Sequence, residues 1–178
     1  MFEVITISGK ARHGKDTTAE MLQYELERQG YNVAIVHYAD MLKYIARQYF
    51  HWNGEKDEQG RTLLQRLGTD VAREKDEDFW VEMLCSIVQV FFSDKDIIII
   101  PDARFINEID FWWNCKKCFK VASIHVTRMN YESELTAEQQ NHRSETELDN
   151  YDFDYYFEAP DLNTLQKLVH DFCNSNLF

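Results

Sequence analysis

A glycine-rich loop near the start of the chain has the residue types and the spacing that bind phosphate. Gly9 follows an apolar run, and after four more residues come Gly14 and Lys15, which gives the pattern G-x-x-x-x-G-K. Glycines let backbone N–H groups turn towards phosphate oxygens, and the N-terminus of the helix that follows adds positive partial charge. Lys15 adds a mobile charge for the β and γ phosphates. The alternative is a glycine-rich turn that only starts a helix.

The residue after Lys15 departs from the usual pattern. A Ser or Thr hydroxyl normally holds Mg²⁺ at this position, whereas this chain has Asp16 followed by Thr17. A carboxylate can hold Mg²⁺ directly or through water, although it also adds negative charge beside the phosphates. We therefore expect Asp16 and Thr17 to bind the metal.

A second group of polar residues follows a run of isoleucines at residues 97–100. Such an apolar run is typical of a central strand that is covered on both faces. Ligands of open α/β sheets bind at the carboxyl ends of the strands, so Asp102 and Arg104 should face Lys15. The acid could orient Mg²⁺ or a substrate hydroxyl, and the arginine suits bidentate phosphate binding. In the alternative, the two side chains pair with each other and cap the next helix.

Strands and helices must alternate to bring these groups together. Apolar patterns predict strands at residues 2–8, 33–38, 97–100, 122–127 and 154–158. They predict helices at residues 16–29, 40–52, 61–73 (interrupted by Gly68), 78–92, 105–114 and 160–173. This order favours a three-layer α/β/α fold of the P-loop NTPase type, with a parallel sheet of about five strands. We expect a single domain over residues 1–178.

Residues 128–150 are polar and charged, with no apolar rhythm long enough for a core element. Two interpretations remain open. The segment is either an exposed surface excursion or a mobile lid, because active-site lids are drawn from weakly packed segments.

Composition limits the partners of the chain. Its 178 residues carry a net charge of −12, which argues against non-specific binding of nucleic acid. A small phosphorylated substrate needs only a local basic pocket. Five basic residues could supply one, namely Arg12, Lys15, Arg73, Arg104 and Arg143.

Two patterns that the sequence lacks bear on the expected cellular location of the protein. It starts directly in a strand without a signal-peptide pattern, and its longest apolar run, at residues 97–101, is too short to cross a bilayer. Cys115 and Cys118 have no second cysteine pair for a zinc site, so we interpret them as reduced thiols. We expect a cytoplasmic protein. Trp112 and Trp113 either pack on the sheet or form a partner surface, which leaves a homodimer open.

Four motifs in order carry a resemblance to a known family. They are Gly14-Lys15-Asp16-Thr17, Leu67-Gly68-Thr69-Asp70 followed by Phe79-Trp80, Pro101-Asp102-x-Arg104, and His142-x-Ser144-Glu145. Together, over residues 5–157, they resemble the deoxynucleoside monophosphate kinases of tailed bacteriophages and related bacterial sequences. The resemblance implies a nucleoside monophosphate kinase-like fold and Mg²⁺-dependent transfer of the γ-phosphate of ATP to a deoxynucleoside monophosphate.

The resemblance also implies roles for individual residues. Those implied for ATP are Gly9, Lys10, Ala11, Arg12, His13, Gly14, Lys15, Asp16, Thr17 and Arg128. Those implied for the acceptor are Lys43, Arg66, Thr69, Asp70, Arg73, Trp80, Asp102, Arg104 and Glu108. Those implied for catalysis are Lys15, Asp102, Arg104 and Arg143. Arg128 and residues 142–145 match the lid, and Trp80 either stacks on a base or belongs to the core.

Other functions compete with this interpretation. Animal phosphomevalonate kinases also carry Gly-Lys-Asp and an Asp-x-Arg-Arg motif, but here Phe105 follows Arg104. Dephospho-coenzyme A kinase is a weaker rival, and a regulator that binds ATP without transferring phosphate is a candidate from another class. A nucleic-acid motor is disfavoured by the small size and the acidic charge. An acceptor phosphate is itself the nucleophile, so a kinase of this kind needs no general base.

Overall fold

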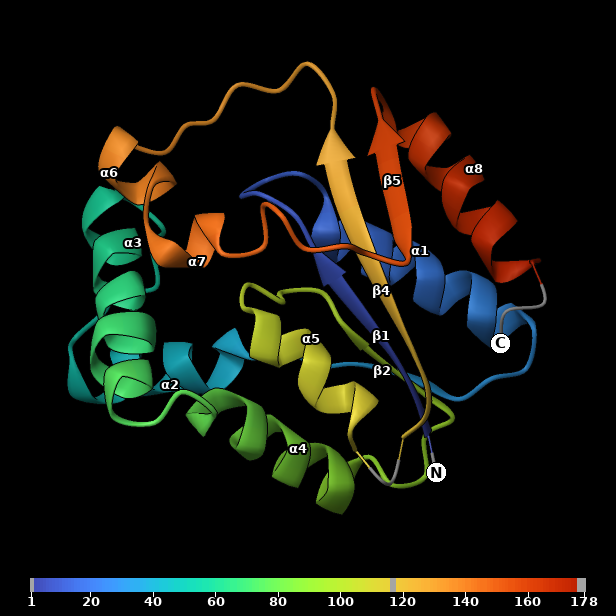
Figure 1. The fold of residues 1–178 in the computed structure, drawn as a ribbon, viewed down its shortest axis with the longest axis horizontal. Helices are drawn as coiled ribbons and strands as arrows, with labels where there is room; N and C mark the ends of the chain where they lie inside the picture. The colour runs from blue at the N-terminus through green and yellow to red at the C-terminus, as the bar shows by residue number, and fades with distance from the viewer. Residues whose placement is uncertain (1, 116–117, 176–178) are drawn as a thin grey trace.

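A five-stranded sheet forms the centre of the computed structural model, which describes residues 2–115 and 118–175. The strand order is β2-β3-β1-β4-β5, and every neighbouring pair is parallel (Figure 1). The strands are β1 (Phe2–Ser8), β2 (Val33–Ile35), β3 (Ile97–Ile100), β4 (Cys118–Arg128) and β5 (Tyr155–Ala159). The expected three-layer α/β fold with a parallel sheet is confirmed.

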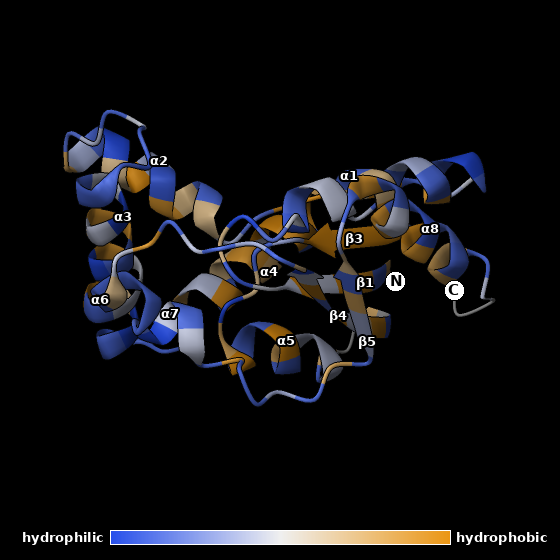
Figure 2. Ribbon diagram, turned by 90° about the horizontal axis from the view of Figure 1, so that it is seen from above, coloured by the Kyte–Doolittle hydropathy of each residue, from blue (hydrophilic) through white to orange (hydrophobic). Residues whose placement is uncertain are grey.

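Helices cover both faces of the sheet. They are α1 (Lys15–Arg28), α2 (Ala39–Tyr49), α3 (Glu58–Gln65), the π-helix η1 (Arg66–Arg73), α4 (Phe79–Phe91), α5 (Ile106–Trp113), α6 (Ala137–Gln140), α7 (Arg143–Thr146) and α8 (Leu162–Cys173). Helices α1 and α8 pack together on one face, and α4 and α5 lie on the other. Figure 2 shows α2, α3, α6 and α7 gathered to one side of the sheet.

The four isoleucines of β3 connect the two halves of the core. Ile97 and Ile99 pack with α1 and α8, whereas Ile98 and Ile100 pack with α4 and the buried Trp112 of α5. This alternation follows from the two-residue period of a strand. All four side chains are fully buried, as expected for a parallel strand with helices on both sides. The adjacent Trp113 is 53% exposed, so the two tryptophans of this pair lie in different environments.

The prediction of one helix at residues 61–73 is wrong in its geometry. Helix α3 begins already at Glu58, and the chain continues from Arg66 as a π-helix. A Cβ at Gly68 would lie 2.8 Å from a methyl group of Leu42, so glycine lets η1 approach α2 closely. The indole N–H of Trp80 donates to the Gly68 carbonyl at 2.8 Å. These long-range contacts explain the wider turn, a geometry that is frequent at functional sites.

Several predicted boundaries also move. Strand β2 ends at Ile35 instead of residue 38, because the Tyr38 N–H and the N–H of the next residue donate to Asp102 instead of to a strand. Strand β4 is longer than residues 122–127 and runs from Cys118 to Arg128. Residues 128–150 contain two short helices, α6 and α7, and bury Gln139 and Leu148.

Two sequence expectations concern membranes and thiols. Within residues 2–115 and 118–175, none of the helices has the length and the apolar character to cross a bilayer. Cys115 and Cys118 are thiols and not a disulfide. Burial, followed by a hydrogen bond with Cys115, raises the pKa of the Cys118 thiol, which argues against a reactive thiolate there.

The buried strand β3 gives a first test of the fold. Ile99→Ala removes a fully buried side chain between two helices, so we expect a loss of about 2–5 kcal/mol in the free energy of unfolding. Leu162→Ala is the matched control, because Leu162 is 63% exposed and its loss should change stability by less than about 0.5 kcal/mol. Urea unfolding measures both. Equal effects would show that β3 is not the core strand.

Candidate active site

The phosphate-binding motif forms a loop between β1 and α1. Gly9 has a φ of 142°, and a Cβ there would lie 2.3 Å from the backbone oxygen of Val126, so this position requires glycine. Gly14 has a φ of 95° and precedes the first turn of α1. The loop therefore ends at a helix N-terminus, where backbone N–H groups and the helix dipole favour an anion.

Lys15 lies within this loop and is almost fully buried. Its ammonium donates to the carbonyls of Gly9 at 2.7 Å and Lys10 at 2.8 Å. Burial, followed by the nearby positive charge of Arg104, lowers the pKa of Lys15 to about 7. Carbonyl dipoles compensate this charge only in part, so an anion in the loop would be a stronger partner for Lys15.

Asp16, next to Lys15, offers an exposed carboxylate beside the loop. Its Oδ1 lies 3.5 Å from Nε2 of His37, and this hydrogen bond lowers the pKa of Asp16. Thr17 is partly buried, whereas the hydroxyl of Thr18 donates to the Gly14 carbonyl at 2.9 Å. In the described part of the chain, no three His, Cys, Asp or Glu side chains form a metal site. The carboxylate of Asp16 and the hydroxyl of Thr17 nevertheless fit Mg²⁺, because that ion takes many of its ligands from substrate phosphates and water.

Residues 128–150 supply carboxylates to the basic side chains around the loop. The ion pairs are Lys10 with Asp149, Arg12 with Glu134, and Arg104 with Glu145. The Lys10 ammonium also donates to the backbone oxygen of Glu145. Figure 1 shows the segment leaving β4, passing through α6 and α7, and returning to β5. Three side chains of the candidate phosphate site are therefore neutralised by one segment of the chain.

The start of this segment packs on the loop itself. The rings of His13 and Tyr131 meet edge to face with centroids 5.7 Å apart, and the Arg128 guanidinium lies over the Tyr131 ring at 5.0 Å. The Arg128 N–H donates to Nδ1 of His13 at 3.4 Å. Ala11, in the same loop, is partly buried.

Asp102 and Arg104 extend from the end of β3 in different ways. The Asp102 carboxylate accepts the N–H groups of Tyr38 at 3.0 Å and Ala39 at 2.9 Å, so it caps the start of α2. The alternative that Asp102 and Arg104 pair and cap the following helix is wrong, because Arg104 binds Glu145 and Asp102 caps a different helix. Arg104 instead lies close enough to Lys15 to lower the pKa of that residue.

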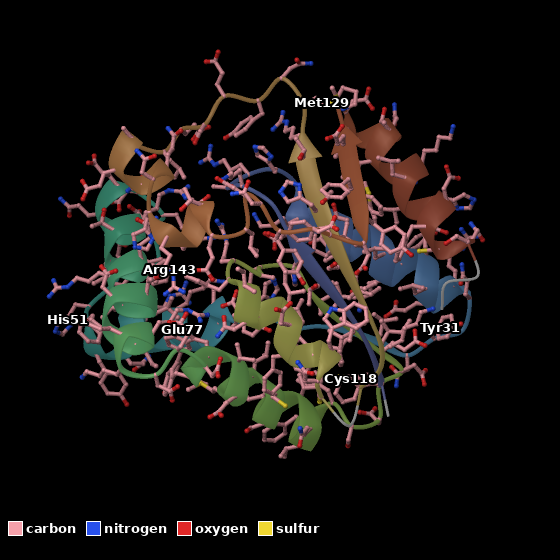
Figure 3. All side chains as sticks on the ribbon, in the orientation of Figure 1. Tyr31, His51, Glu77, Cys118, Met129 and Arg143 are labelled. Atoms are coloured by element: carbon pink, nitrogen blue, oxygen red, sulfur yellow. The ribbon has the colours of Figure 1, made fainter. Side chains whose placement is uncertain are left out.

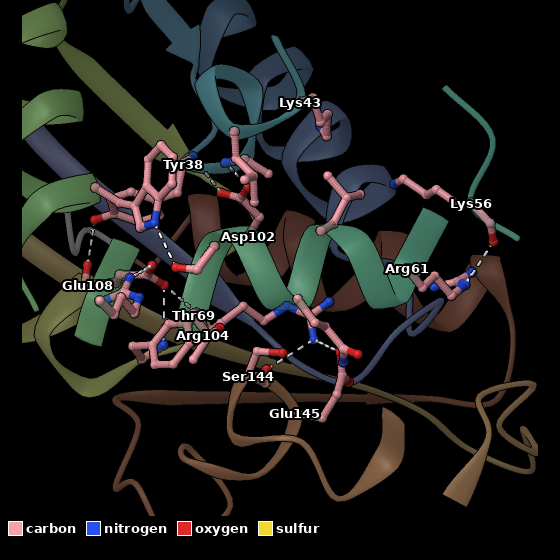
Figure 4. A pocket seen from close by; sticks show the side chains of 18 of the residues that line it. Tyr38, Lys43, Lys56, Arg61, Thr69, Asp102, Arg104, Glu108, Ser144 and Glu145 are labelled. Atoms are coloured by element: carbon pink, nitrogen blue, oxygen red, sulfur yellow. Dashed lines mark hydrogen bonds and ion pairs between the residues drawn. The ribbon is translucent and has the colours of Figure 1, made fainter. Parts of the chain in front are cut away.

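A pocket of about 200 Å³ opens beside the loop (Figure 4). Seven residues expected at the acceptor line it, namely Lys43, Thr69, Arg73, Trp80, Asp102, Arg104 and Glu108. Its wall contains aromatic and aliphatic side chains, which suits a flat organic group, and several cations, which suit an anion. The indole of Trp80 is buried against η1 as well as facing the pocket, so its core and pocket roles coincide.

Three expected residues lie outside this lining. Arg66 is exposed. Asp70 is also exposed, and its Oδ1 lies 3.6 Å from Nε2 of His142. Arg143 forms ion pairs with Glu77 at 2.8 Å and with Glu147 (Figure 3). The described structure does not bring these three side chains to Lys15.

Sequence reasoning missed other residues that line the pocket. They are Tyr38, Ala39, Leu42, Lys56, Arg61, Leu64, Gln65, Phe105 and Leu135. Gly68, Ser144 and Glu145, which belong to the motifs that carry the resemblance, line the pocket as well. Lys56 stands between Glu55 and Asp57 in a polar connector, so its charge gave no local basic pattern. From the helical stretch of α3 and η1, one face lines the pocket, through Leu64 and Gln65 of α3 and Gly68, Thr69 and Arg73 of η1.

A buried ion pair closes the deep end of the pocket. Glu108 binds the Arg73 guanidinium with one carboxylate oxygen and accepts the N–H groups of Arg104 and Phe105 with the other. The Arg73 guanidinium stacks on the Phe105 ring at 3.8 Å. Burial raises the pKa of Glu108 to about 7, although Arg73 opposes the shift. Glu108 therefore fixes the backbone that carries Arg104.

This pair predicts a pH-dependent loss of stability. Arg73→Met leaves the Glu108 carboxylate buried without its partner, so we expect a loss of about 3–5 kcal/mol at about pH 9. The folded pKa of Glu108 lies above its ordinary value of 4.5 and should rise further in the variant. The neutral form therefore supports the fold at low pH, and this support is lost as the pH rises through the folded pKa.

Urea unfolding of both proteins at about pH 6 and about pH 9 checks this prediction, since the deficit should grow as the pH rises above about 7. The double variant Arg73→Met with Glu108→Gln is the control and should lose the pH dependence. A deficit that is the same at both pH values would contradict the ion pair as its cause.

Solved structures show similarity in fold. TT1252 from Thermus thermophilus has a TM-score of 0.57 and 16% identity, with 99% of this chain and 98% of that chain covered. APS kinase from Mycobacterium tuberculosis has a TM-score of 0.48 and 8% identity, with 96% and 94% covered. Shikimate kinase from Bacteroides thetaiotaomicron has a TM-score of 0.46 and 14% identity, with 96% of each covered. Only the first exceeds 0.5, and at 16% identity it shows a shared fold alone.

The sequence comparisons identify the family. No curated protein matches the chain significantly. The family model described as "Deoxynucleotide monophosphate kinase" matches residues 36–168, which include the pocket and residues 128–150. The match does not favour the phosphomevalonate or dephospho-coenzyme A alternatives. The chain belongs to the deoxynucleotide monophosphate kinase family, and its reaction is the transfer of a phosphoryl group to a deoxynucleoside monophosphate.

Proposed function

We propose that ATP binds its phosphates at the loop of residues 9–17 and that the deoxynucleoside monophosphate binds in the adjacent pocket. One observation carries this assignment. A chain with a net charge of −12 places five cationic side chains around a single pocket beside a phosphate-binding motif. The two substrates are anionic, so this local reversal of charge would draw them together.

In the proposed reaction the acceptor phosphate attacks the γ-phosphate of ATP. The bond between the γ-phosphorus and the bridging oxygen breaks, ADP leaves, and the acceptor becomes a diphosphate. The acceptor oxygen is already ionised, so no side chain has to remove a proton. Lys15 and Arg104 would neutralise charge on the transferred group, while Asp102 holds the end of β3 against α2.

Asp16 and Thr17 would hold Mg²⁺ in this proposal. Bound by these two residues, Mg²⁺ would offset negative charge on the phosphates. Asp16 suits the role because its ionised carboxylate is exposed beside Lys15 and is oriented by His37. Gly9, Gly14 and the backbone of residues 10–13 would surround the phosphates.

In the acceptor pocket we assign the base to the deep end. Trp80, Phe105 and Thr69 line that end, next to the buried pair of Arg73 and Glu108. For Arg66 and Asp70 a role in acceptor binding, and for Arg143 a role in catalysis, is proposed from the family resemblance alone. Arg143 could reach the reacting groups only after releasing its partners Glu77 and Glu147.

We further propose that residues 128–150 act as a lid on one domain spanning residues 1–178. Its carboxylates Glu134, Glu145 and Asp149 bind side chains that the nucleotide phosphates also need. Nucleotide binding would therefore exchange a carboxylate for a phosphate at each of these positions. A closed lid would exclude water, which otherwise competes with the acceptor for the γ-phosphate.

The partners of the proposed enzyme are small molecules, with no nucleic acid and no membrane among them. We place its reaction in the cytoplasm. A homodimer is a further expectation, for which the exposed Trp113 is a candidate surface residue.

Lys15 gives the direct test of the donor site. Lys15→Ala removes the buried ammonium of the loop, so we expect kcat to fall about 100- to 1,000-fold. The measurement is ADP release from Mg·ATP with a panel of deoxynucleoside and nucleoside monophosphates. Lys75→Ala is the control, because Lys75 is exposed and lies outside the pocket lining. Near-normal turnover by folded Lys15→Ala would contradict the donor assignment.

The lid proposal predicts a gain in ATP affinity. Glu134→Gln and Asp149→Asn each remove a carboxylate that competes with phosphate, so ATP should bind up to about fivefold more tightly at low salt. Glu138→Gln is the matched control, because Glu138 lies in the same segment and has no ion pair in the described structure. Calorimetric titration with ATP measures the three variants. Weaker binding in the first two would mean that these carboxylates hold the nucleotide instead of competing with it.

A further inference from the structure

The cations around the pocket are not equivalent. Three of the five have a carboxylate partner: Lys43 pairs with Asp40 at 3.1 Å, Arg73 with Glu108, and Arg104 with Glu145. The other two, Lys56 and Arg61, have no carboxylate within ion-pair distance in the described part of the chain. Among the described residues, the pocket therefore contains two positive charges that have no ion-pair partner.

These two side chains lie together. The Arg61 Nε–H donates to the backbone oxygen of Lys56 at 2.9 Å. Figure 4 draws both at one end of the pocket, with Tyr38 and Glu108 at the other. Partial burial and the positive charge of Lys43 lower the pKa of Lys56, Asp16 opposes the shift, and Arg61 and Arg104 add to it. The ammonium of Lys56 thus has the cations Lys43, Arg61 and Arg104 in its surroundings, and the charge of Asp16 in the donor loop also acts on it.

The connector that carries Lys56 is anchored on both sides of it. The Trp52 indole N–H donates to the Glu55 carbonyl at 2.8 Å, and the Asp57 carboxylate accepts the N–H of Gly60 at 2.7 Å. A Cβ at Gly60 would lie 2.1 Å from the Glu55 carbonyl, so glycine is needed for this close packing. The backbone of Lys56 is therefore held in place, although no residue that the structure describes gives its side chain a hydrogen bond or an ion pair. A lysine that only improved solubility would not need such support.

We infer that Lys56 and Arg61 bind the phosphate of the acceptor nucleotide and so determine that the enzyme selects monophosphates over nucleosides. This inference rests on the proposed acceptor pocket and names the residues that recognise the phosphate. A phosphate monoester carries nearly two negative charges at neutral pH, which matches the two unpaired cations. Arg61 can form paired hydrogen bonds to phosphate oxygens, whereas Lys56 acts as a point charge.

The arrangement also sets the direction of the acceptor. Lys56 lies at the end of the pocket that is close enough to Asp16 and Arg104 for their charges to act on it, whereas Tyr38 and Glu108 lie towards the other end. A nucleotide with its phosphate on Lys56 and Arg61 would direct its base into the aromatic end. Its phosphate would then point to the γ-phosphate at the loop, as the transfer requires.

The test compares ligands with and without a phosphate. For Lys56→Ala and Arg61→Ala we expect KM for the deoxynucleoside monophosphate to rise about tenfold or more. The dissociation constant of ATP should change by less than about twofold, because the donor loop is intact. Binding of the matching deoxynucleoside, which lacks the phosphate, should be unchanged in both variants. Lys56→Arg keeps the charge and should recover most of the lost affinity.

Lys75→Ala is the matched control for the loss of one positive charge, because Lys75 is exposed outside the pocket lining. The inference is overturned if the Lys56 and Arg61 variants raise KM no more than this control does. It is also overturned if deoxynucleoside binding weakens as much as monophosphate binding, since the two residues would then shape the pocket without reading the phosphate.

Failure of the proposed function has a different signature. In that case the wild-type protein would release no additional ADP with any monophosphate. The ratio of deoxynucleoside to monophosphate dissociation constants, measured by titration without ATP, tests Lys56 and Arg61 independently of turnover. This ratio should fall towards one in the double variant.

Discussion

Repulsion between like charges is the constraint that this site has to satisfy. Lys15 and Arg104 lie close enough for one to lower the pKa of the other, and Lys10 lies in the same loop. Each of these cations therefore needs a partner when no phosphate is present. Lys15 uses loop carbonyls, whereas Lys10 and Arg104 use carboxylates of residues 128–150. The position of that segment is thus tied to the charge of the phosphate site.

The end of β3 provides the rigid side of the same arrangement. Asp102 binds the start of α2, and Glu108 holds both the Arg104 backbone and the Arg73 side chain. Both acids thus accept hydrogen bonds from protein donors in this structure, which gives each of them a structural contact at the pocket. Both acids therefore act in positioning: Glu108 holds Arg73 and the backbone of Arg104, whereas Asp102 holds the start of α2.

Much of the fold could be predicted from the sequence because its main signals are local. The isoleucines of β3 predict a buried strand by themselves, and Gly14 with Lys15 predicts the loop by spacing alone. The π-helix could not be predicted, since it depends on Gly68 meeting Leu42 and Trp80 from other elements. In the candidate site, too, local spacing predicts the residues of the phosphate loop, whereas it does not predict the ion pairs between distant residues.

Long-range pairing is what the sequence could not indicate. Lys10 and Asp149 are separated by 139 positions, and nothing near either residue points to the other. The family motif predicts Arg143 near the reacting groups, but Glu77, 66 positions away, and the nearby Glu147 hold it elsewhere. Lys56 stands between two acidic residues, so the sequence shows no basic cluster there. These charged side chains come together only in the folded chain, so their pairing is not visible in the sequence.

The close approach of Gly9 to Val126 has a mechanical consequence. Val126 lies two positions before Arg128, where β4 ends. With no room for a side chain between them, the backbone of the donor loop lies directly against the end of β4, so a displacement of one would press on the other. A movement of the segment that follows Arg128 would therefore also have to break the contacts that this segment makes with Lys10, Arg12 and His13 of the loop.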